Sequence, residues 1–138
     1  ERFYQEHYFE HLEHLVVPEE VPEIFRRLRE ERIATAVVTN TQKSLATTIV
    51  ERAGATPDLV VGGGDAPRGK PAPDSLLLAS RLLSVGPGDA WMVGDTSFDR
   101  EAAGGAGMWF VGVGIEGDAR VEALRELLDL VGLTGRAR

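Results

Sequence analysis

Short apolar runs alternate with amphipathic segments along most of this chain, and that alternation most constrains its fold. Runs short enough to be buried strands occur at 33–39, 59–62, 90–95 and 108–114. Apolar side chains at helical spacing occur at 21–32, 42–53, 74–83, 97–106 and 118–131. Because strands that alternate with helices build parallel sheets with right-handed crossovers, we predict an α/β fold with a parallel sheet and helices on both faces.

Composition narrows the classes of partner and location. The net charge is −7 and no basic stripe is present, so we expect no nucleic-acid partner. The longest apolar runs are far shorter than the ~20 residues of a membrane-spanning helix, so we expect no membrane association. The chain has no cysteine, which excludes disulfides and is typical of a cytoplasmic protein.

Polar and charged residues lie where the predicted strands end. Thr39 and Asn40 end the first strand, Lys70 lies in the loop after the second, and Asp95 and Asp99 follow the third. Ligands of open α/β sheets bind at the carboxyl ends of the strands, so these side chains should converge. A hydroxyl, a backbone N–H and an ammonium suit a phosphate, and two carboxylates suit Mg²⁺.

Each of these residues also has a purely structural interpretation. A threonine that ends a strand is often a helix cap, and a lone lysine in a Gly/Pro loop is often a solvated surface charge. Asp95 and Asp99 could be a turn residue and a cap. Their joint occurrence in order at successive strand ends favours a phosphate and Mg²⁺ site.

At this point the sequence resembles a known family. The segments VVTN (37–40), GKPAPD (69–74) and VGDTSFDREAAGGAGM (93–108) are similar to motifs II, III and IV of the haloacid dehalogenase superfamily, and most similar to its phosphoglycolate phosphatase-like members. The resemblance implies a Rossmann-like core and a Mg²⁺-dependent hydrolase that acts on a small phosphorylated metabolite. It implies that Thr39, Asn40 and Lys70 bind the phosphate and that Thr39 and Lys70 are catalytic. It also implies that Asp95 and Asp99 bind the metal.

One motif of that family is missing. Its motif I, D-x-D, supplies an aspartate nucleophile and a general acid, but no two aspartates here are two residues apart. In the family the motif I strand is central in the sheet, between the strands of motifs II and IV. We therefore expect an incomplete core, with 1–17 as the end of a helical cap and its linker and 18–138 as the C-terminal part of the core. We expect a truncated sequence, inactive by itself.

Other interpretations stay open at this stage. The chain could be a non-catalytic module of the same fold that binds a phosphate or a partner, or part of a phosphomutase. A dehalogenase is less favoured, because the carboxylates of GDTSFD suit metal-dependent phosphoryl chemistry. The strands at 33–39 and 90–95 should either stay apart, leaving a gap, or collapse into direct pairing.

Overall fold

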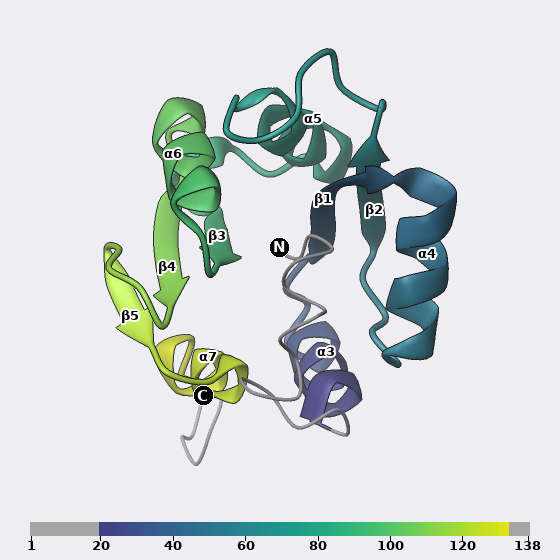
Figure 1. Cartoon of the computed structure of the whole chain (residues 1–138). Coiled ribbons are helices and arrows are strands. Elements are labelled where there is room, and N and C mark those ends of the chain that lie inside the picture. The colour runs from purple at the N-terminus through teal and green to yellow at the C-terminus, as the bar shows by residue number, and fades with distance from the viewer. Residues whose placement is uncertain (1–19, 133–138) are drawn as a thin grey trace.

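The computed structural model describes residues 20–132 and confirms the predicted α/β fold (Figure 1). The helices are α3 (Glu20–Glu30), α4 (Lys43–Arg52), α5 (Asp74–Leu83), α6 (Ser97–Ala106) and α7 (Leu127–Leu130). The strands are β1 (Ala36–Gln42), β2 (Leu59–Gly63), β3 (Trp91–Gly94), β4 (Trp109–Val113) and β5 (Ala119–Val121). Short 3-10 turns, η1 (Pro87–Asp89) and η2 (Leu124–Glu126), precede β3 and α7. No helix among these residues is long and apolar enough to cross a membrane.

The strands form two separate parallel sheets. One sheet pairs β1 with β2, and the other has the order β3-β4-β5. Within the described residues β1 and β3 are not hydrogen-bonded to each other. The strands of motifs II and IV therefore stay apart, and the collapse considered above does not occur.

Helices cover both faces of these sheets. Successive strand residues point to opposite faces, so Val37 and Val38 belong to different cores. Val37 packs in the core formed with α3, α4 and α7, and Val38 packs in the core formed with α5 and α6. The two halves are joined at both ends: α5 contacts β1, β2 and α6, while α3 contacts α7 and η2 (Figure 1).

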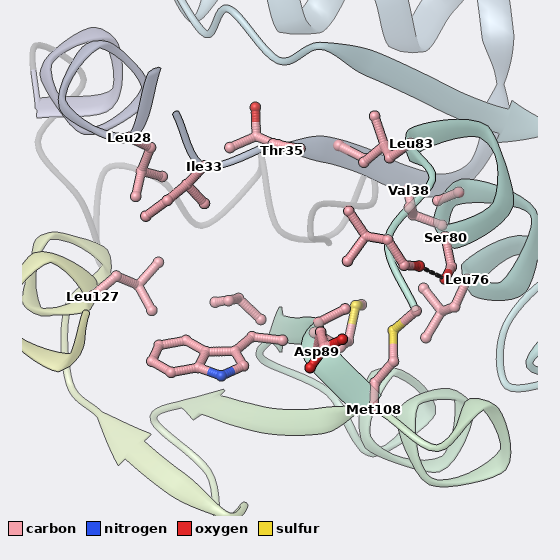
Figure 2. Close-up of a pocket in the computed structure, with 18 of the residues that line it drawn as sticks. Leu28, Ile33, Thr35, Val38, Leu76, Ser80, Leu83, Asp89, Met108 and Leu127 are labelled. Carbon is pink, nitrogen blue, oxygen red and sulfur yellow. Dashed lines mark hydrogen bonds between the residues drawn. The ribbon is translucent and has the colours of Figure 1, made fainter. Parts of the chain in front are cut away.

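An apolar cleft of about 470 Å³ lies between the two sheets. Residues of β1, β3, α3, α5 and α7 line it, and Figure 2 shows Leu28, Ile33, Val38, Leu83 and Leu127 around it. Trp91, the first residue of β3, also lines the cleft and is 44% exposed. Apolar side chains line this cleft, and among residues 20–132 no strand lies between β1 and β3.

The last predicted helix is wrong. The apolar spacing in 118–131 indicated one helix, but the segment forms β5, η2 and α7 instead. The side chains of Val121, Leu124, Leu127 and Leu128 are nevertheless buried in one core, as that spacing required. A short strand followed by a 3-10 turn and one short helix buries the same side chains as a single helix would, so periodicity alone did not distinguish the two. The predicted cap segment 1–17 lies outside the described residues.

Candidate functional site

The first site residues were predicted to end the first strand, but they lie in an irregular part of β1, which continues to Gln42. Regular pairing stops at Val38, opposite Val61, and resumes at Gln42, opposite Gly63. Three residues of β1 therefore lie opposite the single Gly62 of β2, which is a bulge. A Cβ on Gly62 would lie 2.5 Å from the Lys43 Cα, so only glycine allows this approach.

Thr39 and Asn40 occupy the bulge with opposite exposures. Thr39 is 4% exposed, and its Oγ1 accepts a hydrogen bond of 3.0 Å from the backbone N–H of Thr41. Since that bond uses only an acceptor position, the Thr39 hydroxyl keeps a proton to donate. Asn40 is exposed, and its side chain turns to the loop that carries Lys70.

Lys70 is buried, which is unusual for a lysine in a Gly/Pro loop. Its side chain is 0% exposed, and its Nζ donates to the Val38 carbonyl at 2.9 Å and to Asp99 Oδ1 at 2.8 Å. One ammonium thus joins the end of the regular part of β1 to the first turn of α6. The carboxyl ends of β1 and β3 therefore meet at Lys70, as the strand-end argument predicted.

Asp99 is held from two sides. Its Oδ1 accepts from Lys70, and its Oδ2 accepts from the Thr96 hydroxyl at 2.9 Å and from the Thr96 backbone N–H at 3.3 Å. The Asp99 N–H donates back to Thr96 Oγ1 at 3.2 Å, which completes a capping box at the start of α6. Both carboxylate oxygens accept hydrogen bonds, one from Lys70 and one from Thr96. In the described residues Asp99 therefore orients the Lys70 ammonium. Metal coordination by Asp99 stays a prediction.

Gly94 is required by a close approach of side-chain atoms and not by its backbone conformation. Its φ is not in the left-handed region, where the structure places five other glycines. A Cβ on Gly94 would lie 2.5 Å from both the Cβ and the Oδ2 of Asp99. Glycine is needed here because the Asp99 side chain packs directly against the end of β3.

Asp95 follows β3 directly and is half-buried. A carboxylate at this edge is a suitable hard ligand for Mg²⁺, which usually takes one or two carboxylates and keeps several waters. Residues 20–132 contain no group of three or more His, Cys, Asp or Glu side chains that could hold a metal by itself. A Mg²⁺ ion at this edge would take Asp95 as one ligand and would fill its other positions with waters or with groups outside residues 20–132.

Sequence reasoning missed several contacts that build the site. The Thr96–Asp99 capping box has a sequence signal, the pattern T-x-x-D before a helix. The amide contacts of Asn40 and the Val38 carbonyl that accepts from Lys70 have none, because each joins residues about thirty positions apart.

Comparison with known proteins identifies the family of this chain. The family model for haloacid dehalogenase-like hydrolases matches residues 1–113. The chain belongs to that family. The resemblance inferred from the three motifs is therefore confirmed, and the buried Lys70–Asp99 pair lies between motifs III and IV of a haloacid dehalogenase-like core.

The relatives of this haloacid dehalogenase-like chain are named for different reactions. It is 32% identical over 141 residues to a phosphoglycolate phosphatase of Chromobacterium violaceum, covering 94% of this chain and 64% of that protein. It is 41% identical over 63 residues to a phosphonoacetaldehyde hydrolase of Nitratidesulfovibrio vulgaris, covering 45% of this chain and 22% of that protein.

A solved structure shows the same fold. The HAD-superfamily hydrolase of subfamily IA, variant 1, from Geobacter sulfurreducens superimposes with a TM-score of 0.73 at 29% identity. The match covers 83% of this chain and 55% of that one. The chain thus spans between about half and two thirds of this structure and of the phosphoglycolate phosphatase.

Proposed function

We propose that this chain is the C-terminal part of a Mg²⁺-dependent phosphatase that hydrolyses a small phosphomonoester of the phosphoglycolate kind. The single observation that carries the proposal is the buried Lys70, held between the end of β1 and the start of α6 by Val38 and Asp99. A buried ion pair contributes little net stability compared with apolar packing, so its presence at a strand edge favours a role in binding or catalysis.

The phosphate would lie beside Thr39 and Lys70. The Thr39 hydroxyl would donate to one phosphate oxygen, and the backbone N–H of Asn40 would donate to another. Lys70 would offset negative charge on the transferring phosphoryl group, and Asp99 would keep its ammonium oriented. Asp95 would hold Mg²⁺, which supplies further positive charge at the phosphoryl oxygens when bound.

The nucleophile would come from a segment outside this chain. The resemblance implies an aspartate at the end of a strand between β1 and β3, and the apolar cleft has the place and lining for such a strand. The aspartate oxygen would bond to phosphorus while the bond from phosphorus to the leaving alkoxide breaks. Water would then hydrolyse the aspartyl phosphate, releasing inorganic phosphate and regenerating the carboxylate.

Phosphate release provides the test. The coding sequence upstream of Glu1 is joined to this chain, and the longer protein is incubated with 2-phosphoglycolate and a panel of other small phosphomonoesters. We expect Mg²⁺-dependent release of inorganic phosphate that EDTA abolishes, and none from the 138-residue chain alone. Lys70→Ala should abolish release, whereas Lys43→Ala, which removes a half-exposed lysine, is the matched control.

Two outcomes would contradict the proposal. Turnover by the 138-residue chain alone that is lost in Asp95→Ala would mean that a residue of this chain accepts the phosphoryl group. Interconversion of sugar phosphates without net phosphate release would support a phosphomutase instead.

A further inference from the structure

The side chain of Asn40 makes two hydrogen bonds to the main chain of one residue. Its Oδ1 accepts from the Lys70 backbone N–H at 3.0 Å, and its Nδ2 donates to the Lys70 carbonyl at 3.0 Å. We call this pair of bonds the Asn40–Lys70 bridge. A carboxamide has both a donor and an acceptor, so it can satisfy both main-chain groups of one residue at once.

Gly69 makes the bridge possible. A Cβ at this position would lie 2.4 Å from Asn40 Oδ1 and 2.9 Å from its Cγ. Any larger residue would therefore push the Asn40 amide away from Lys70. The loop approaches β1 closely because glycine precedes the lysine.

Lys70 is consequently fixed to β1 at both of its ends. The bridge holds its main chain to the bulge, and the Val38 carbonyl accepts from its Nζ at 2.9 Å. The bridge ties the main chain of Lys70 to β1, and from there the side chain reaches both Val38 and Asp99.

We propose that the Asn40 side chain is a positioning residue that sets the location of the Lys70 ammonium through the Asn40–Lys70 bridge. The inference deepens the proposed function, on which it rests only for what Lys70 does to a phosphate. The location of the ammonium itself can be measured without any substrate.

The two lysines of the chain provide that measurement. Lys70 has a 0% exposed side chain and Lys43 a 54% exposed one, so an amine acylating reagent such as acetic anhydride should modify Lys43 and spare Lys70. The ratio of acetylation at the two lysines, read by mass spectrometry on the folded chain, reports how firmly Lys70 is held. Lys43 serves as the internal reference in every sample.

Asn40→Ala should raise the Lys70:Lys43 labelling ratio at least about fivefold, since two hydrogen bonds that hold the loop are lost. The melting midpoint should fall by only a few degrees, because Asn40 is exposed and belongs to neither core, so the variant stays folded during labelling. Gln42→Ala is the matched control. It removes another exposed amide of β1, one that bonds to Ser44, and should leave the ratio unchanged. An unchanged ratio in Asn40→Ala would overturn the inference.

Two further variants keep the test decisive. Gly69→Ala should raise the ratio as Asn40→Ala does, and the double variant should show no further increase, because both changes break the same bridge. Asn40→Asp, which keeps the acceptor and loses the donor, should give an intermediate ratio. Fully additive effects of Gly69→Ala and Asn40→Ala would contradict the bridge.

Labelling and turnover separate the two proposals. If the ratio rises in Asn40→Ala while the longer protein releases no phosphate, the proposed function fails and the positioning role stands. If phosphate is released and the ratio does not change, the function stands and the positioning role fails.

Discussion

The Lys70 ammonium donates a 2.8 Å hydrogen bond to Asp99 Oδ1, and both side chains are 0% exposed. Removing one member of such a pair leaves the other charge buried without compensation. Asp99→Ala should therefore lower the free energy of unfolding by about 3–5 kcal/mol, measured by urea denaturation. Arg68→Ala, which breaks a pair with Asp74 whose arginine is 72% exposed, should cost less than about 1 kcal/mol. Equal losses in the two variants would show that burial of the Lys70–Asp99 pair has no special weight.

Glycines of one region should respond in opposite directions to alanine. Gly94→Ala places a Cβ 2.5 Å from the Asp99 Cβ and should lower the free energy of unfolding by about 1–3 kcal/mol. Gly104→Ala in α6 meets nothing within 4 Å and should raise it by roughly 0.5–1 kcal/mol, because alanine restricts the unfolded chain. Chemical denaturation of both variants checks the signs, and a neutral Gly94→Ala would contradict the close approach.

The Thr96 hydroxyl should matter twice, as the cap of α6 and as a support of Asp99. Thr96→Ala removes both and should lower the free energy of unfolding by about 1–2 kcal/mol, measured by chemical denaturation. Thr96→Ser keeps the hydroxyl and is the matched control, with an expected change of a few tenths of a kcal/mol. If serine costs as much as alanine, the methyl group and not the capping box stabilises this turn.

Tryptophan fluorescence should report whether a strand enters the cleft. Trp91 lines the cleft and Trp109, its partner in the β3–β4 register, does not. In Trp109→Phe the emission of Trp91 should shift to shorter wavelength when the upstream segment is added, because burial removes water from the indole. In Trp91→Phe the emission of Trp109 should shift much less. Equal shifts in both variants would place the added segment elsewhere.

The sequence predicted the parts of the site well and their arrangement only in outline. Lys70 and Asp99 were named from their places after strands, and the structure brings them into contact. Thr39 and Asn40 were expected to end a strand but lie within the bulge of β1. The bulge was not predictable, because it depends on the way Gly63 of β2 approaches Asn40 of β1 and Gly62 approaches Lys43 at the start of α4.

The sequence alone determined the alternation of strands and helices, because that pattern depends on side chains a few positions apart and on which of them must be buried. It also determined which polar residues follow each strand, and hence the family. Only the tertiary structure decided how those residues are used. The Asn40–Lys70 bridge joins residues thirty positions apart. The cleft between β1 and β3 is lined by elements from α3 to α7. Such contacts depend on the packing of whole elements, which no local pattern encodes.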